Sequence, residues 1–338
     1  MKIIYNCDFL NSGLHFLANN LRFCCAPAHD GPNISAVLPG SKRVISDLMK
    51  LRQKTIEDMK NHVAHKECLG CIYLKEYDIS SPDTPLNIVS MQNSKPLISH
   101  LVVDHFKQCD CSCIYCQIRK EMKTITTEPK YGDYYKLYPI IEQLYREKLL
   151  DKKNLTVEFM GGNISVLKEF PDLVKIFLKN NVKAFTFYTN GIKFLPDIVE
   201  ASKKADVMLI TSLDAGTRDT FKKIKNVDKF DDVVENLRKY RAECKNFEMY
   251  TKYVLMENIN DNKEEIDNFL IQSLYAGTDI VQMDIDYNKF MNSKGVRNYV
   301  PKHFYELFDY FREQCELRYI KSFVWEYTQQ ILDRGYFE

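Results

Sequence analysis

From about residue 97 onward, short apolar runs rich in β-forming residues alternate with stretches whose apolar side chains recur at helical spacing. In one such stretch Phe170, Val174 and Phe177 fall on one face of a helix. Strands that alternate with helices are typical of βα units around a parallel sheet. The pattern predicts an α/β fold, a partial (β/α)6 TIM-like barrel. Its predicted strands are residues 97–103, 155–160, 184–189, 207–212, 247–255 and 279–285.

Two of these strands have one polar face. In the last strand Gln282 and Asp284 lie opposite Val281 and Met283, and Lys252 lies on the polar face of the strand before it. A closed barrel is normally filled with branched apolar side chains, so polar faces that point inward fit an open barrel holding a polar substrate. Lys252, Gln282 and Asp284 are therefore candidates for substrate contacts, chosen from strand parity.

The first 92 residues lack this alternation. They contain a stretch rich in Gly, Pro and Asn, one predicted helix over residues 41–63, and a Ser/Pro/Asp-rich loop near residue 80. We expect three regions, namely an irregular cysteine-rich segment at residues 1–92, the partial barrel at 93–300 and a helical, aromatic-rich cap at 301–338.

Composition and charge are those of an ordinary globular protein. Of 338 residues, 45% are hydrophobic and 28% charged, which argues against disorder. Lys and Arg total 47 against 46 Asp and Glu, so the net charge does not favour binding to nucleic acid or to an anionic membrane. The pair Lys222-Lys223 indicates a solvated helix face. No run approaches the roughly 20 apolar residues of a membrane span. The N-terminus lacks the features of a secretory signal. We expect a cytoplasmic protein without nucleic-acid or membrane partners.

Eleven cysteines are distributed unevenly. Cys109, Cys111, Cys113 and Cys116 fall within eight positions. In a reducing compartment, clustered cysteines indicate metal ligands more readily than disulfides. The spacing of Cys109, Cys113 and Cys116 suits a [4Fe–4S] cluster that keeps one iron without a protein ligand, because Cys111 is crowded between two ligands. A structural zinc site is the alternative on spacing alone.

The loop Cys109-x-x-x-Cys113-x-Tyr115-Cys116, directly after the first predicted strand, resembles the signature of the radical S-adenosylmethionine superfamily. Further short motifs follow the next strands in the expected order, and the resemblance covers about residues 97–290. It implies that these motifs and Tyr115 bind S-adenosylmethionine. The implied cofactor-binding residues are Tyr115, Gly161, Gly162, Asn163, Tyr188, Asn190, Ser212 and Asp214. Asn163 stands where the superfamily usually has a glutamate.

The resemblance implies that the cluster, reduced by a donor such as flavodoxin or ferredoxin, cleaves S-adenosylmethionine and that a 5′-deoxyadenosyl radical abstracts hydrogen from the substrate. The chain also resembles radical proteins of bacterial capsule and surface-polysaccharide gene clusters, whose chemistry is poorly defined. The first hypothesis is a sugar or sugar-derived substrate that is epimerised, dehydrated or oxidised. The alternatives are a peptide maturase and, disfavoured by the barrel motifs, a zinc-stabilised binding protein without catalysis.

The N-terminal cysteines suggest a second metal site. Cys68-x-x-Cys71 presents two thiolates one turn apart, and Cys7 and Cys25 are candidates to complete a four-thiolate site. The segment resembles the SPASM-type auxiliary-cluster modules of some radical enzymes, moved to the N-terminus. We therefore predict a second iron–sulfur cluster ligated by Cys7, Cys25, Cys68 and Cys71. In the alternative interpretation Cys7 and Cys24 are merely buried thiols.

Overall fold

The computed structural model describes residues 2–18, 21–23, 44–65, 68–69, 71, 73–85, 88, 97–116, 118, 135–292, 295–296 and 300–334. The chain divides into two compact units. The first unit comprises Met1–Lys107, Tyr131–Gly161 and Pro171–Lys183, and the second comprises Gln108–Lys130, Gly162–Phe170 and Ala184–Glu338.

The first unit contains a sheet of strand order β6-β5-β2-β3, which is parallel except for the antiparallel pair of β2 and β3. Strands β1 and β4 form a separate antiparallel pair. The strands are β1 (Ile3–Asn6), β2 (Gly13–Leu17), β3 (Leu21–Arg22), β4 (Lys75–Asp78), β5 (His100–Asp104) and β6 (Thr156–Phe159). The helices are α1 (Asp8–Ser12), α2 (Val44–Lys60), α5 (Tyr138–Arg146) and α6 (Phe170–Lys179).

Aromatic packing joins the sheet of the first unit to its helices. The rings of Phe159 on β6 and Phe177 on α6 meet edge to face at 6.4 Å, and Tyr145 on α5 meets Phe177 at 6.3 Å. Burying such a side chain contributes about 1.5–3 kcal/mol, so one apolar sheet face is firmly held. Alternation then leaves His100 and Asp104 of β5 on the opposite, polar face.

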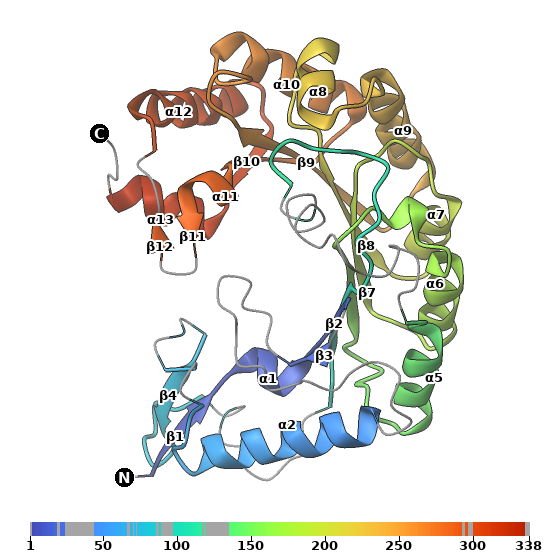
Figure 1. The fold of residues 1–338 in the computed structure, drawn as a ribbon, viewed down its shortest axis with the longest axis vertical. Helices are drawn as coiled ribbons and strands as arrows, with labels where there is room; N and C mark the ends of the chain where they lie inside the picture. The colour runs from blue at the N-terminus through green and yellow to red at the C-terminus, as the bar shows by residue number, and fades with distance from the viewer. Residues whose placement is uncertain are drawn as a thin grey trace, which may run out of the picture. The chain divides into compact units, whose positions relative to one another are not determined.

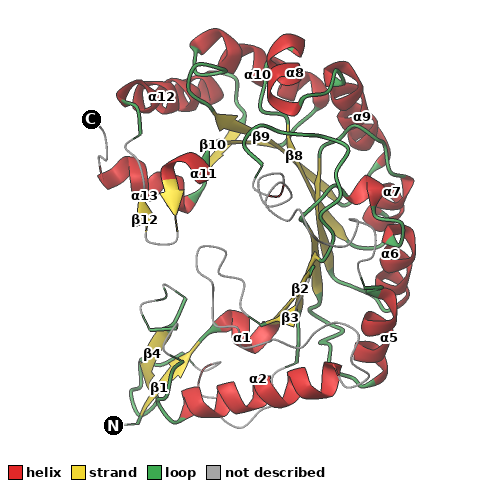
Figure 2. Ribbon diagram, in the orientation of Figure 1, coloured by secondary structure: helices red, strands yellow, loops and turns green. Residues whose placement is uncertain are grey.

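The second unit contains parallel strands in the order β13-β10-β9-β8-β7. Helices α7, α9 and α10 follow one side of these strands (Figure 1 and Figure 2). The main strands are β7 (Ala184–Thr189), β8 (Asp206–Ser212), β9 (Phe247–Leu255), β10 (Ile280–Ile285) and β13 (Lys321–Val324). The longer helices are α7 (Pro196–Ser202), α8 (Arg218–Lys225), α9 (Phe230–Glu243), α10 (Lys263–Ala276), α12 (Lys302–Leu317) and α13 (Glu326–Arg334). The shorter elements are η1 (Ile164–Val166), α11 (Tyr287–Phe290), β11 (Met291–Asn292) and β12 (Gly295–Val296).

Local sequence fixes where α8 begins and ends. The hydroxyl of Thr217 accepts the backbone N–H of Thr220 at 3.4 Å, which caps the first turn. Asn226 ends the helix in the left-handed region at φ 55°, a conformation that asparagine tolerates. The last helical residue, Lys225, is thereby held at a fixed place beside the end of the sheet.

The six predicted strands are confirmed as β5 to β10, with ends shifted by a few residues at most. The predicted helix over residues 41–63 is α2. The N-terminal segment is more regular than expected, because β2 joins β5 in parallel. The C-terminal region likewise adds β13 beside β10. In the part of the chain that is described, no helix is both long and apolar enough to cross a membrane.

Candidate cofactor site

The cysteine loop is fastened to the end of α8. Backbone N–H groups of Ser112 and Ile114 donate to the carbonyl oxygens of Lys225 and Ile224, each at 3.0 Å. The side-chain amide of Asn226 donates to the carbonyl of Ser112 at 2.6 Å. These contacts use backbone groups that a helix end leaves unpaired, so the loop conformation is set by the helix terminus.

Hydrogen bonds within the loop lower the pKa of two of its thiols and raise the pKa of a third. The hydrogen bond from Cys111, assisted by the positive charge of Lys225, lowers the pKa of Cys113 to about 6. The hydrogen bond from Cys111 also lowers the pKa of Cys109, whereas these contacts raise the pKa of Cys111 above its usual range. Since the thiolate is the form that binds metal, the chemistry of Cys109 and Cys113 fits an iron–sulfur cluster.

Cys116, the third predicted ligand, follows one turn later, with its N–H donating to the carbonyl of Cys113 at 3.2 Å. Among the described residues, no three Cys, His, Asp or Glu side chains are arranged at metal-binding spacing. The three-cysteine ligand set thus stays a prediction.

A buried ion pair lies beside this loop. Lys225 and Asp214 side chains are 2% and 0% exposed, and the ammonium donates to Asp214 Oδ2. Lys225 also donates to the Tyr115 hydroxyl at 3.0 Å, which in turn donates to Asp214 at 2.5 Å. Although burial lowers the pKa of Lys225, the adjacent carboxylate outweighs burial and raises it well above its usual range. The Lys225 ammonium therefore stays charged near Cys113, as one half of an ion pair with Asp214 that has no net charge.

Asp214 occupies a left-handed backbone conformation at φ 61°. Its Oδ1 accepts the backbone N–H of Val254 at 2.9 Å. A non-glycine residue in this region costs about 1–3 kcal/mol and persists only where the surroundings hold it. The sequence predicts that Asp214 binds the cofactor. In the structure Asp214 has no exposed surface and contacts Lys225 and Tyr115.

Two predicted asparagines converge on a loop residue that the sequence did not single out, Asp110. Asn163 and Asn190 donate to Asp110 Oδ1 at 2.8 and 2.6 Å, and Asn163 donates to Asn190 Oδ1 at 2.9 Å. The amide of Asn190 also lies 3.2 Å from Cys111 Sγ. Burial raises the pKa of Asp110, but the hydrogen bonds from Asn190 and Asn163 lower it overall. The loops after β6 and β7 thus meet the cysteine loop at an ionised carboxylate.

The remaining predicted cofactor residues lie at strand ends. Gly161, in the first unit, has φ 98°, and a side chain there would meet the Asp104 carboxylate and, at 2.9 Å, the carbonyl of Phe106. Only glycine fits this position. Gly162 opens the turn to Asn163, and Tyr188 and Ser212 are half-buried near the ends of β7 and β8.

The three candidate substrate residues are close together on β9 and β10. Lys252 Nζ lies 2.9 Å from Asp284 Oδ2, and Gln282 donates to the same oxygen at 2.6 Å. Thr328 donates to Asp284 Oδ1 at 3.1 Å. The carboxylate is 3% exposed whereas the Lys252 side chain is 27% exposed. Asp284 therefore positions Lys252, and the lysine presents the accessible charge.

A hollow of about 150 Å³ opens beside Tyr115 in the second unit. Its lining combines apolar side chains with three charged ones, Glu257, Asp286 and Lys289. It is lined by Ile114, Tyr115, Met256, Glu257, Ile259, Asp286, Lys289 and Phe290.

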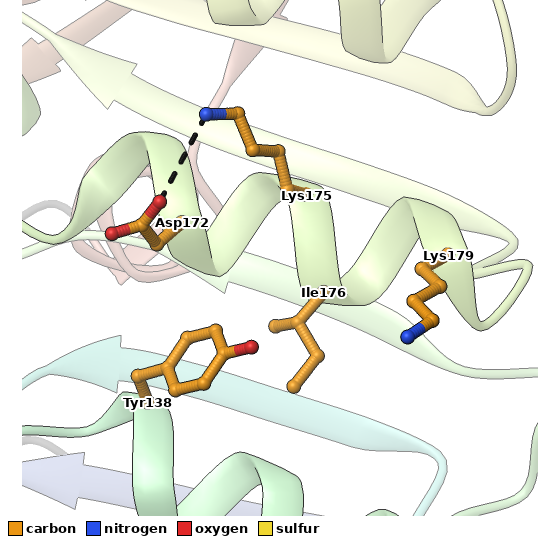
Figure 3. Close-up of a pocket in the computed structure, with 5 residues that line it drawn as sticks. All are labelled: Tyr138, Asp172, Lys175, Ile176 and Lys179. Atoms are coloured by element: carbon orange, nitrogen blue, oxygen red, sulfur yellow. Dashed lines mark ion pairs between the residues drawn. The ribbon is translucent and has the colours of Figure 1, made fainter.

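A larger hollow of about 330 Å³ lies between α5 and α6 of the first unit (Figure 3). Its lining includes the exposed pair Asp172 and Lys175, whose charged atoms are 3.9 Å apart. An exposed pair at this distance contributes little, and none of the predicted site residues lines this hollow.

The thiol arrangement predicts selective alkylation of the iron-free protein. At pH 7 the pKa of about 6 leaves Cys113 mostly as thiolate, while Cys111 stays protonated. Iodoacetamide is expected to label Cys113 well before Cys111, with the Cys113 rate falling as the pH drops through about 6. Peptide mass spectrometry over a pH series measures this order. Faster labelling of Cys111 at pH 7 would contradict the assignment.

Comparison with known proteins gives three results. Residues 103–270 match the model of the radical SAM superfamily. A "GTPase Obg" of Brachyspira hyodysenteriae is 34% identical over 178 residues, which are 50% of this chain and 25% of that protein. SuiB of Streptococcus suis has a similar structure, with a TM-score of 0.52 in its S-adenosylmethionine complex and 0.50 in its complex with the precursor peptide SuiA.

The S-adenosylmethionine complex of SuiB is 16% identical in sequence, and the match covers 83% of this chain and 63% of SuiB. The SuiA complex is 14% identical, and the match covers 83% of this chain and 62% of SuiB. The chain thus spans a quarter of its curated relative and less than two thirds of SuiB. Likeness at this identity concerns the fold, and it supports the expected α/β architecture of partial TIM type with a largely parallel sheet.

Proposed function

We propose that this chain, which carries a radical S-adenosylmethionine domain and is therefore an enzyme, reductively cleaves S-adenosylmethionine at a [4Fe–4S] cluster held by Cys109, Cys113 and Cys116. The domain implies both cofactors. The observation that carries the ligand assignment is the spacing of Cys109, Cys113 and Cys116 in one short loop, and the lowered pKa of Cys109 and Cys113 supports it. When bound, the cofactors supply one-electron cleavage and the radical that removes hydrogen from the substrate. A flavodoxin or ferredoxin is the proposed electron donor.

The chain's own residues orient these groups. Lys225 and Asp214 fix the Tyr115 hydroxyl and with it the last turn of the cysteine loop. We assign the hollow beside Tyr115 to the adenosine of S-adenosylmethionine, because Met256 and Ile259 offer apolar walls and the carboxylates in its lining suit ribose hydroxyls. Within the second unit, the methionine part is assigned to the strand-end residues Gly162, Asn163, Tyr188, Asn190 and Ser212.

The proposed substrate is a sugar or sugar-derived metabolite. Its support is the polar face of β9 and β10, where Lys252 is partly accessible and pairs with Asp284, which also accepts a hydrogen bond from Gln282. Such groups suit a hydroxylated or anionic ligand. In the test, reconstituted protein receives sugar nucleotides deuterated on the ring. Deuterium recovered in 5′-deoxyadenosine supports the proposal, and stimulation by a precursor peptide instead would favour a maturase.

A peptide substrate is the second candidate. SuiB, similar in structure over 83% of this chain, is bound to its precursor peptide SuiA in one solved structure. A gene for a short peptide beside the gene of this protein would favour this candidate. Sugar-nucleotide enzymes encoded there would favour the first.

We also propose a second iron–sulfur cluster on Cys7, Cys25, Cys68 and Cys71. Cys25 lies outside the described residues. Phe9 and Tyr73 meet edge to face at 4.9 Å, so the segments that carry Cys7 and Cys71 are packed against one another. The Cys109/Cys113/Cys116 triple alanine variant is expected to keep roughly half of about 8 iron atoms per chain. Iron analysis measures this, and a variant with essentially no iron would exclude the second cluster.

A further inference from the structure

One cysteine of the loop has no role in the proposed cluster. Cys111 lies between Cys109 and Cys113, and its backbone N–H donates to Cys109 Sγ at 3.4 Å. Its thiol is hydrogen-bonded to the thiols of both neighbours. The Cys111 sulfur is therefore held beside the sulfur atoms of two proposed ligands, and metal binding does not explain why a cysteine stands at this position.

The backbone bends at Asp110, which separates Cys109 from Cys111. Residues two apart in a chain have Cα atoms at most about 7.6 Å apart, and a bend shortens this distance toward the roughly 4.4–6.8 Å found across a disulfide. The side-chain amide of Asn190 lies 3.2 Å from Cys111 Sγ and 3.9 Å from Cys109 Sγ, so both sulfur atoms face one group. The Asp110 carboxylate accepts the same amide at 2.6 Å and pairs with Lys193 at 3.6 Å, which holds the bend. The two thiols are thus placed to bond to one another.

Exposure separates the two thiols of this pair. Cys109 is exposed, whereas Cys111 is half-buried. An exposed cysteine without a metal is open to oxidation, which is irreversible beyond the sulfenic acid, whereas a disulfide is reopened by excess thiol. We propose that, in protein that lacks its cluster, Cys109 and Cys111 form a reversible disulfide, with a low-molecular-weight disulfide such as oxidised glutathione as the oxidant. The bond protects the ligand loop until a cluster is loaded.

The exchange has two steps. The Cys109 sulfur attacks one sulfur of the small disulfide, whose S–S bond breaks and releases one thiol. The Cys111 sulfur then attacks Cys109 Sγ in the mixed disulfide and releases the second thiol. The two cysteines lose two electrons and two protons, and the two released thiols carry them. The protective role rests on the proposed function, whereas the bond itself forms without iron or S-adenosylmethionine.

Iron-free protein incubated anaerobically with excess oxidised glutathione tests the pairing. The remaining thiols are blocked with N-ethylmaleimide, and trypsin, which cleaves after Lys107 and Arg119, releases the loop as one peptide. Tandem mass spectrometry of this peptide locates the bond. We expect a disulfide between Cys109 and Cys111, with Cys113 outside it, and we expect dithiothreitol to reopen it.

The competing role for Cys111 is that of a hydrogen-bonding spacer. Cys111→Ser separates the two roles, because serine keeps a donor but has no sulfur. This variant is expected to stop at the mixed disulfide of Cys109 with glutathione, and disulfide formation within the loop is expected to slow by roughly 10-fold or more. Cys244→Ser, which changes a thiol at the end of α9, is expected to match the wild type.

Three results would overturn the inference. They are a loop disulfide that joins another pair of cysteines, one that forms as fast in Cys111→Ser as in the wild type, and a wild-type loop that keeps the mixed disulfide or does not react. If the Cys109–Cys111 disulfide forms but the cluster-loaded protein leaves S-adenosylmethionine intact, the proposed function fails and the pairing stands.

Discussion

Replacing Cys109, Cys113 and Cys116 together by alanine is expected to abolish release of 5′-deoxyadenosine from S-adenosylmethionine, while Cys111→Ser keeps most of it. Three thiolates are the proposed attachment of the cluster, and without them the electron has no carrier at this site. Cys111 is the thiol whose pKa is raised, so it stays protonated and is not needed as a ligand. Chromatography of anaerobically reconstituted variants with dithionite measures the product.

A cysteine outside the loop provides the control. Cys244→Ser removes a half-buried thiol at the end of α9, away from the cysteine loop in sequence, and is expected to leave product release near the wild-type level. Serine at position 111 can still donate a hydrogen bond to its neighbours. If Cys111→Ser loses product as completely as the triple variant, the division of the thiols into ligands and non-ligand is wrong.

Lys225→Met is expected to lower the free energy of unfolding by about 3–5 kcal/mol, because it leaves the Asp214 carboxylate buried without its counter-charge. Asp214 is 0% exposed and Lys225 is 2% exposed, so water cannot replace the missing partner. Urea unfolding of the iron-free protein, followed by circular dichroism, measures the loss.

Lys223→Met on the same helix is the matched control. Lys223 is exposed, and its replacement is expected to change stability by less than about 0.5 kcal/mol. Asp214→Asn combined with Lys225→Met removes both charges and is expected to recover part of the lost stability. A Lys225→Met protein as stable as the Lys223→Met protein would show that the pair does not brace the loop.

The strands were predictable where periodicity was long enough to read. Residues 184–189 alternate over their whole length and residues 247–255 over most of theirs, and both strands are observed with the predicted bounds. Gly13–Leu17 and Lys321–Val324 are too short for such a signal, and their pairing partners β5 and β10 are distant in sequence. Tertiary pairing, which the local pattern does not encode, makes them strands.

In the site, too, residues with a local sequence signal were predicted, and residues defined by tertiary contacts were not. The cysteines were found because their spacing carries the signal in one short segment. Lys225 was missed because its neighbours Lys222 and Lys223 are exposed as predicted, and only the fold shows that Lys225 turns inward to Asp214. Asp110 was treated as a spacer between ligands, and its role depends on amides that lie 53 and 80 residues further along the chain.

The most direct measurement is of 5′-deoxyadenosine released by the wild-type protein. Anaerobically reconstituted protein, dithionite and S-adenosylmethionine together are expected to yield it, and omission of dithionite is expected to prevent its formation. Iron-loaded, reduced protein that leaves S-adenosylmethionine intact would contradict reductive cleavage as the function of this chain.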